Sequence, residues 1–97
     1  MPTDEELKIA MLALQVLCRG SGALTRDSIR YEIRNRRNVY VNRRDLRPIL
    51  DDLSRDGFLT RIQTTDRNGK PEIKYQITVM GYERYDALQR HRGRRSK

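Results

Sequence analysis

Apolar residues in the first twenty positions recur with helical spacing. Thr3 followed by Glu6 is typical of a capping box, and apolar residues then return every three or four positions as far as Cys18. The pattern predicts a first helix that is ended by the glycines at 20 and 22. Its apolar surface is wider than a one-sided helix needs, so we expect this helix either to be central in the core or to meet a second subunit.

A second helix is predicted from Thr25, its cap, to about Asn35. Ile29 and Ile33 face inward in this helix. Arginines at four-residue intervals form one outer stripe, which consists of Arg26, Arg30 and Arg34. Residues 36–41 are then predicted to be a connector.

A third helix is predicted from Asn42, its cap, to Gly57. Its inner face is formed by Leu46, Ile49, Leu50 and Leu53. Pro48 is expected either to kink the helix or to delay its start to Asp45, because an interior proline loses a backbone hydrogen bond and clashes with the preceding turn.

After Gly57 the apolar positions alternate, which predicts two strands. Asn68-Gly69 is the strongest short signal for a hairpin, with a type I′ turn. Folding about this turn places the apolar side chains of both strands on one face, with Ile62 opposite Tyr75. The other face is then free for anions, and with the tip of the hairpin it carries Arg61, Lys74, Arg67 and Lys70.

Thr78 caps a fourth predicted helix, from Val79 to about Arg90. Its apolar residues are expected to pack inward or against a neighbouring subunit; they include Tyr82, Tyr85 and Leu88. Residues 92–97 contain no apolar side chain, and we expect them to be a disordered basic tail. The predicted organisation is one domain over residues 1–91 and a tail over 92–97.

Composition excludes a large enzyme fold and favours a polyanionic partner. The 97 residues are 36% hydrophobic and 35% charged, enough for one modest core. The net charge of +8 points to nucleic acid first and an anionic membrane second. Residues 26–47 hold eight basic and three acidic residues, and residues 84–97 hold six and one. Most of the basic residues are arginine, whose planar fork suits phosphate oxygens and guanine edges.

No catalytic or metal-binding constellation is evident. Cys18 is the only cysteine, which excludes an intramolecular disulfide and a cysteine-based metal site within one chain. His91 is the only histidine and lies near the predicted tail, and the aspartates at 51, 52 and 56 are interpreted as a solvated face. The apolar run 9–18 is too short to span a bilayer and follows acidic residues. We therefore expect a soluble, unexported cytoplasmic protein that is not an enzyme and binds no cofactor or metal.

The order of predicted elements, over roughly residues 5–90, resembles the winged helix-turn-helix domain. Residues 50–59 contain L-x-x-L-x-x-x-G-F-L, which resembles the end of a recognition helix running into the wing. Residues 75–83 contain Y-x-I-T-x-x-G-x-E, which is similar to a segment of PadR-like and MarR-like regulators. The implied fold is α+β, with a three-helix core, a two-stranded β-hairpin wing and a C-terminal helix. Small, arginine-rich domains of this kind also resemble archaeal and archaeal-virus regulators.

The resemblance implies a sequence-specific regulator of transcription that binds double-stranded DNA. The recognition helix, about residues 42–56, would lie in the major groove, and the wing, residues 58–78, on an adjacent groove or the backbone. A homodimer joined through the first helix, the fourth helix or both would place two recognition helices on two half-sites. Regulation by a small ligand is not expected, because this length leaves no room for a separate effector domain.

The residues themselves are suited to that work. Arg43, Arg44 and Arg47 lie on the outer side of the third helix near its start, where an arginine can donate two bonds to guanine O6 and N7. Asn42 is either a DNA contact or a plain helix cap. The full set of candidate DNA-binding residues is Asn42, Arg43, Arg44, Arg47, Arg36, Arg37, Arg61, Arg67, Lys70 and Lys74. The basic tail would add salt-dependent affinity that is independent of sequence.

Other functions stay open on the sequence alone. An architectural chromatin protein would bind DNA with little sequence preference, although the acidic residues in 48–60 argue against a uniform DNA coat. A winged helix can also be an adaptor in a protein or ribonucleoprotein assembly, which would not need the outward arginines of the third helix. RNA binding is a further alternative, for which Tyr40 is the one aromatic residue expected on a basic loop.

Overall fold

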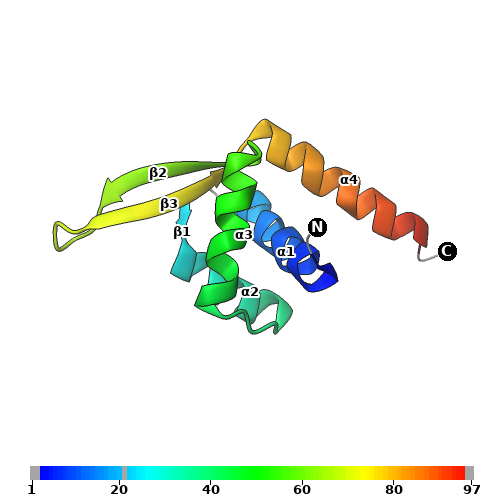
Figure 1. The fold of residues 1–97 in the computed structure, drawn as a ribbon, viewed down its shortest axis with the longest axis horizontal. Helices are drawn as coiled ribbons and strands as arrows, with labels where there is room; N and C mark the ends of the chain where they lie inside the picture. Colours follow the sequence, from blue (N-terminus) through cyan, green and yellow to red (C-terminus); the bar gives the residue numbers. More distant parts are fainter. Residues whose placement is uncertain (1–2, 21, 96–97) are drawn as a thin grey trace.

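The computed structural model describes residues 3–20 and 22–95, with side chains described as far as residue 90. Within these residues the elements follow in the order α1 (Asp4–Arg19), β1 (Leu24–Thr25), α2 (Arg26–Arg37), α3 (Arg43–Arg55), β2 (Leu59–Thr65), β3 (Pro71–Ile77) and α4 (Val79–Arg95). The helices α1, α2 and α3 form the body, from which the β2–β3 hairpin projects on one side and α4 on the other (Figure 1). The predicted α+β class, with its three-helix core, hairpin and C-terminal helix, is confirmed.

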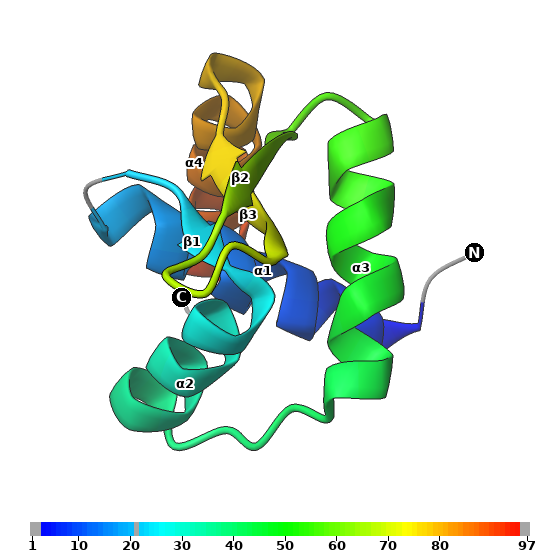
Figure 2. The same ribbon diagram turned by 90° about the vertical axis from the view of Figure 1, so that its left-hand side faces the viewer.

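Helix α1 is the centre of the core. It contacts α2, α3, α4 and β3, and five consecutive residues, 13–17, are buried on it. Figure 2 shows α2 and α3 joined at one end of the molecule by their connector, with α1 passing behind them. The largest fully buried side chains are Leu14, Leu17, Ile29, Ile33, Leu46 and Leu50, each of which stabilises the fold by about 1.5–3 kcal/mol through burial. The wide apolar surface of α1 is thus explained by packing on several sides.

Side-chain caps fix the starts of the first three helices as predicted. The backbone N–H of Glu6 donates to Thr3 Oγ1 at 3.1 Å, and that of Ser28 donates to Thr25 Oγ1 at 3.1 Å. The N–H of Arg44 donates to Asn42 Oδ1 at 3.0 Å. Each cap satisfies a donor that has no partner inside its helix, which is worth about 1 kcal/mol.

Helix α2 extends past its predicted end near Asn35. Its cap is Asn38, which takes the left-handed conformation with φ of 54° and donates its N–H to the Arg34 carbonyl at 2.9 Å. Asparagine tolerates this conformation better than other non-glycine residues, so it can close a helix where no glycine is present. Residues 36 and 37 therefore belong to the last turn of α2, and their assignment to a connector was wrong.

Pro48 does not delay the start of α3. The helix is continuous from Arg43 to Arg55 and includes the proline, whose side chain is exposed. The N–H groups of Asp45 and Leu46 both donate to the Asn42 carbonyl at 3.0 Å, so the first turn is closed ahead of the proline. The predicted alternative of a start at Asp45 is wrong, and the outward arginines before it are helical.

The hairpin belongs to a three-stranded antiparallel sheet, in the order β1-β3-β2. The short strand β1, which the sequence analysis did not predict, pairs Leu24 with Tyr75 and Thr25 with Lys74. Strand β1 leads directly into α2, so the pairing fastens the base of the hairpin to the start of that helix. Apart from this added strand, the hairpin consists of two strands, β2 and β3, as predicted.

The hairpin turn differs from the predicted type I′ turn. The N–H of Asp66 donates to the Lys70 carbonyl at 2.9 Å, and that of Gly69 donates to the Asp66 carbonyl at 3.1 Å, which encloses a loop of three residues, 67–69. Gly69 has a positive φ of 81°, whereas Asn68 does not. Asp66 stabilises this geometry, because its Oδ1 accepts bonds from the N–H groups of Asn68 and Lys70 at 2.8 and 2.9 Å.

The longer loop changes the register by one residue and therefore exchanges the faces of one strand. Arg61 lies opposite Tyr75, and Ile62 lies opposite Lys74. Arg61 thus shares a face with buried Tyr75, while Lys74 is on the other face. The predicted pairing of Ile62 with Tyr75, and the predicted single basic face holding both Arg61 and Lys74, are wrong.

The two sequence segments that resemble regulators meet at one junction between α3, the sheet and α4. Gly57 ends α3 with a positive φ of 86°, and its carbonyl accepts the hydroxyl of Thr78 at 2.7 Å. Thr78 Oγ1 in turn accepts the N–H of Gly81 at 3.1 Å. A Cβ on Gly81 would lie 2.3 Å from the Phe58 carbonyl oxygen, so this position requires glycine.

Helix α4 continues to Arg95, past its predicted end near Arg90. The predicted boundary after residue 91 therefore falls inside a helix. Residues 92–95 of the predicted disordered tail thus belong to α4, and residues 96 and 97 lie outside the described residues. Across the residues that the structure describes, each helix is too short or too polar to cross a membrane.

Candidate nucleic-acid interface

The first turns of α3 present three arginines to solvent. Arg43, Arg44 and Arg47 are exposed, while Leu46, between them in sequence, is fully buried. The helical period turns the arginines outward because it turns Leu46 into the core. Within the described residues, the guanidinium groups of Arg44 and Arg47 have no ion-pair partner. Two unpaired cations therefore lie at the start of the predicted recognition helix.

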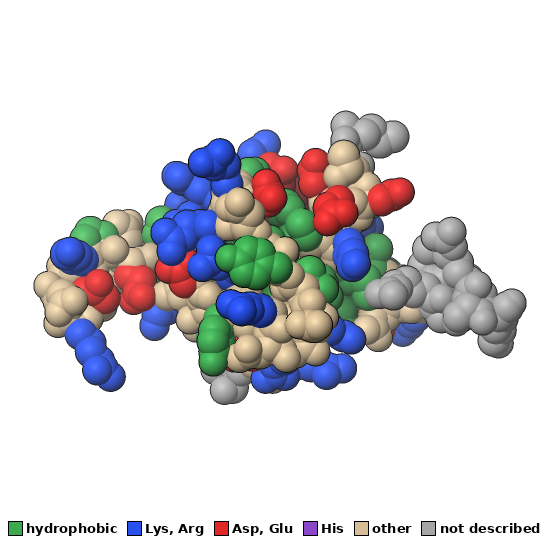
Figure 3. Space-filling model, turned by 90° about the horizontal axis from the view of Figure 1, so that it is seen from below, with side chains coloured by type: hydrophobic (Ala, Val, Ile, Leu, Met, Phe, Trp, Pro, Cys, Tyr) green, Lys and Arg blue, Asp and Glu red, His purple; other side chains and the backbone are tan. Residues whose placement is uncertain are grey.

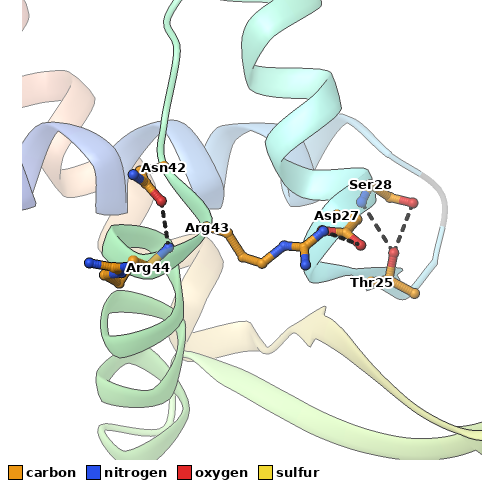
Figure 4. A network of polar contacts seen from close by, with 6 residues as sticks. All are labelled: Thr25, Asp27, Ser28, Asn42, Arg43 and Arg44. Atoms are coloured by element: carbon orange, nitrogen blue, oxygen red, sulfur yellow. Dashed lines mark hydrogen bonds and ion pairs between the residues drawn. The ribbon is translucent and has the colours of Figure 1, made fainter.

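Arg43 and Asn42 have partners inside the chain. Arg43 reaches from α3 to α2, where its Nη2 lies 3.3 Å from Asp27 Oδ1 (Figure 4). Both side chains of this pair are more than half exposed, so the pair contributes at most about 1 kcal/mol and a phosphate can replace the carboxylate. The side-chain oxygen of Asn42 caps α3 by accepting the N–H of Arg44. This bond supports the cap interpretation of Asn42.

Arg36 and Arg37 lie away from this turn. They line a hollow with residues of α1, among them Val16 and Arg19. Nε of Arg36 pairs with Glu32 Oε2 at 2.7 Å, one turn back along α2. Arg37 has a more specific partner, Gln15, whose Oε1 accepts its Nε–H at 2.6 Å.

Arg37 completes a polar network that joins three helices. Gln15 on α1 is only 4% exposed, and its Nε2 donates to the Tyr85 hydroxyl on α4 at 3.0 Å. Without Arg37, the buried Gln15 oxygen would lose its hydrogen-bond donor. The structure therefore groups Arg37 with the packing of α1, α2 and α4, a role that the sequence analysis did not anticipate.

The Arg37→Ala variant is expected to unfold with a free energy about 1 kcal/mol lower than that of the wild type, because the buried Gln15 oxygen is left unpaired. Chemical denaturation measures the change. Arg36→Ala is the matched control, and its exposed pair with Glu32 predicts a loss below about 0.5 kcal/mol. Unchanged stability of Arg37→Ala together with weaker DNA binding would instead make Arg37 the DNA contact predicted from the sequence.

The wing carries its cations at separate places. Arg67 and Lys70 are exposed in the turn of the hairpin, at the end farthest from the helices (Figure 1). Lys74 is half-buried on the central strand, while Arg61 lies on the face of Tyr75. Only the two tip residues are thus brought together as predicted.

Tyr75 holds the base of the wing against α3. Its side chain is 3% exposed, and its hydroxyl donates to Asp51 Oδ1 at 3.5 Å. Burial and the negative charge of Asp51 raise the pKa of Tyr75, against a smaller lowering by Arg61 and Arg26. The phenol therefore stays protonated at neutral pH and remains a hydrogen-bond donor. The wing is positioned relative to α3 through this contact.

Basic side chains gather on the side of the molecule that carries α2 and the start of α3. Figure 3 shows this side, with Lys and Arg over much of the surface and hydrophobic side chains among them. Asp45 is the one acidic residue in the first turn of α3, whereas Asp51 and Asp52 lie toward its other end, where Asp52 pairs with Arg55 at 3.0 Å. One end of α3 is therefore suited to a polyanion.

The sequence matches no protein-family model and no curated protein, but solved structures resemble the fold closely. A PadR-like transcription factor from Bacteroides fragilis superposes with a TM-score of 0.82 at 17% identity, covering 95% of this chain and 86% of that one. A transcriptional regulator from Clostridium thermocellum gives 0.80 at 14% identity, covering 99% and 92%. This chain has the winged-helix fold. Bacillus subtilis PadR, solved in complex with operator DNA, gives 0.73 at 21% identity over 92% of this chain and 48% of that chain.

The winged-helix fold assigns names to the elements. Helices α2 and α3 occupy the positions of the helix-turn-helix, α3 is at the position that this fold calls the recognition helix, and the β2–β3 hairpin is at the position of the wing. The junction of Gly57, Thr78 and Gly81 is where the wing meets α3 and α4. The resemblance drawn from residues 50–59 and 75–83 is thereby confirmed at the level of the fold.

The winged-helix surface also contains an exposed tyrosine that the sequence analysis missed. Tyr31 is 62% exposed on α2, and Tyr40 is 76% exposed in the connector. The sequence contained a signal for Tyr31. It is two positions from both Ile29 and Ile33, and two residues turn an α-helix by about 200°, so its side chain lies on nearly the opposite side of the helix from theirs. Both tyrosines lie beside the arginines of α2.

The described residues show no metal-binding site and no activated nucleophile. Among the described residues, no group of three or more His, Cys, Asp or Glu is arranged to hold a metal ion. Burial raises the pKa of the Cys18 thiol, so this residue stays protonated and a poor nucleophile. The side chains of His91 and of the basic residues after it lie outside the described part.

Proposed function

We propose that this chain is a cytoplasmic transcriptional regulator that binds double-stranded DNA in a sequence-specific manner. The observation that carries the proposal is the pair of exposed, unpaired arginines, Arg44 and Arg47, on the recognition helix of a winged-helix fold. The Bacillus subtilis neighbour, which shares the fold, was solved with operator DNA, and this supports duplex DNA as the partner. We assign the chain a binding function and no catalytic activity.

Sequence would be read by α3 in the major groove. Each arginine that donates two bonds to guanine O6 and N7 discriminates against the wrong base by about 1–3 kcal/mol. Arg43 would exchange Asp27 for a phosphate. The α2 stripe, formed by Arg26, Arg30 and Arg34, would hold the backbone and fix the register of α3 without reading sequence.

A homodimer is supported by apolar surface on α1 and α4. Four large hydrophobic side chains are between 43% and 74% exposed there, namely Leu7, Val79, Met80 and Tyr82. A hollow of about 530 Å³ also lies between α1, α3 and α4, with Leu7, Phe58 and Leu88 in its lining. Contact between two copies through this side would leave both α3 helices free for two half-sites of a palindrome.

Selection from random duplexes tests the function. Bound sequences are enriched over several rounds at two salt concentrations, and affinity is then measured for enriched and bulk DNA. The proposal predicts an enriched palindrome that is bound at least about 1,000-fold more tightly than bulk DNA. Binding without enrichment and with a steep salt slope would replace the proposal by an architectural role. Absence of duplex binding at low salt would overturn both DNA-binding functions and leave a role as an adaptor in a protein or ribonucleoprotein assembly.

The wing tip is expected to increase affinity for DNA through its charge without contributing to sequence specificity. Replacement of both Arg67 and Lys70 by alanine should flatten the slope of log affinity against log salt by about 2, since each lost phosphate contact removes about one released counterion. The preferred sequence should stay the same. A changed preference at unchanged salt slope would show that the tip reads bases, and an unchanged slope and affinity would remove the tip from the interface.

A further inference from the structure

Two exposed tyrosines share a hollow with several arginines. The hollow has a volume of about 350 Å³ and lies between α2 and the connector to α3. Its lining consists of Asp27, Arg30, Tyr31, Arg34, Tyr40, Val41 and Arg43. This volume is within the range of small-ligand sites, about 300–1,000 Å³. Nothing in the duplex-reading role of α3 uses these aromatic rings.

The fold itself keeps both rings in solvent. Tyr40 stands between Val39, which is partly buried, and Val41, which is 3% exposed. Because both valines are anchored in the core, the side chain between them is directed outward. Tyr31 is directed outward by buried Ile29 and Ile33 on the same helix. Their exposure follows from neighbouring core positions and is not an accident of side-chain conformation.

The hollow is positively charged, and its acidic residue is already paired. Arg30, Arg34 and Arg43 contribute three guanidinium groups, whereas Asp27 is the one acidic residue in the lining. Asp27 forms the ion pair with Arg43 at 3.3 Å. The Arg34 guanidinium carbon lies 5.5 Å from the centre of the Tyr40 ring, which places a cation directly beside an aromatic face.

Aromatic rings beside cations are complementary to an unpaired nucleotide. An unpaired base stacks on tyrosine while arginine neutralises its phosphate, whereas the bases of a duplex are stacked on each other and cannot reach a protein ring. We propose that the hollow lined by Tyr31, Tyr40 and Arg34 binds single-stranded nucleic acid by stacking an unpaired base between α2 and the connector.

The site adjoins the proposed duplex surface through a shared residue. Arg43 lines the hollow and also belongs to the first turn of α3. A strand that leaves a duplex bound on α3 can therefore continue into the hollow. This geometry predicts that a duplex with a single-stranded extension binds more tightly than the same duplex with blunt ends.

Tyrosine fluorescence and anisotropy test the proposal in the full chain. The chain has no tryptophan, so its intrinsic fluorescence comes from tyrosine and is quenched when a base stacks. The probes are labelled oligo(dT) and oligo(rU) of about ten nucleotides, the mononucleotides TMP and UMP, and a blunt duplex. We expect Tyr31→Leu and Tyr40→Leu each to lower affinity for a single strand by about 5- to 100-fold.

Matched variants separate stacking from other effects. Gln76→Leu on β3 removes an exposed side chain that lies outside the hollow, and this variant should bind as the wild type does. Tyr31→Phe and Tyr40→Phe keep the ring and should retain binding. Each variant is required to show the thermal unfolding of the wild type, which is expected because both positions are exposed.

The outcomes distinguish this site from the proposed function. The stacking site would be overturned if the leucine variants bound a single strand as tightly as the wild type does. It would also be overturned if the phenylalanine variants lost as much single-strand affinity as the leucine variants. The absence of single-strand binding at a salt concentration where the duplex binds would overturn it too. Single-strand binding without duplex binding would support the site and overturn the proposed function. The dT and rU probes decide between DNA and RNA, and tight binding of TMP or UMP alone would assign the hollow to a free nucleotide.

Discussion

The variant with both Arg44 and Arg47 replaced by alanine is expected to bind a selected duplex at least about 30-fold more weakly than the wild type. Two bidentate contacts to guanine account for this loss, at about 1–3 kcal/mol each. Stability should stay within about 0.5 kcal/mol of the wild type, because both side chains are exposed and form no ion pair among the described residues. Fluorescence anisotropy at fixed salt measures the affinity.

Two controls distinguish base reading from charge. Arg55→Ala removes an arginine from the far end of the same helix, where it pairs with Asp52, and should leave affinity unchanged. Arg44→Lys and Arg47→Lys keep the charge but lose the planar fork, so they should lose preference for the selected sequence while keeping the salt slope. Equal losses of the alanine variant on selected and bulk DNA would contradict base reading and leave only phosphate binding.

The Gly81→Ala variant is expected to lower the free energy of unfolding by about 3 kcal/mol, through overpacking against the backbone. The added Cβ would lie 2.3 Å from the Phe58 carbonyl oxygen and 2.6 Å from Ile77 Cγ1. Alanine is ordinarily the better helix former by about 1 kcal/mol, so a loss here reports the contact and not helix propensity. The melting temperature should fall by more than about 10 °C.

Glu83→Ala is the control for Gly81→Ala. It changes an exposed position two residues further along α4 and should alter stability by less than about 0.5 kcal/mol. A Gly81→Ala variant as stable as the wild type would show that α4 can shift away from Phe58 without cost. The junction of Gly57, Thr78 and Gly81 would then not fix the direction of α4.

Local signals predicted the helices and their starts. Thr3, Thr25 and Asn42 each cap the helix for which the sequence proposed them, because a cap bond joins residues two or three positions apart. The buried faces followed from helical spacing in the same way. The winged-helix resemblance added the order of elements, which local patterns alone do not specify.

The sequence predictions were wrong where the structure depends on contacts between residues far apart in the chain or on a backbone conformation that the sequence only permits. The register of the hairpin depends on Asp66, whose carboxylate selects a three-residue loop over the two-residue turn favoured by Asn68-Gly69. Strand β1 exists because Leu24 pairs with Tyr75, far along the chain. Helix α2 ends late because Asn38 takes a left-handed conformation, which a sequence permits but does not require.

The candidate site was only partly predictable for the same reason. The outward direction of Arg44 and Arg47 followed from the helical period of α3. The partner of Arg37 did not, because Gln15 lies 22 residues away on another helix. Likewise, Arg61 and Lys74 were placed on one face by a register that the loop length changed.

Protection of guanine N7 from methylation by dimethyl sulfate tests the central claim that α3 reads DNA in the major groove. N7 lies in that groove and accepts one of the two bonds that an arginine donates to guanine. On the selected duplex, wild-type protein should protect guanines in two clusters about one helical turn apart, and the double alanine variant at Arg44 and Arg47 should not. A bound complex in which every guanine N7 stays reactive would contradict the account.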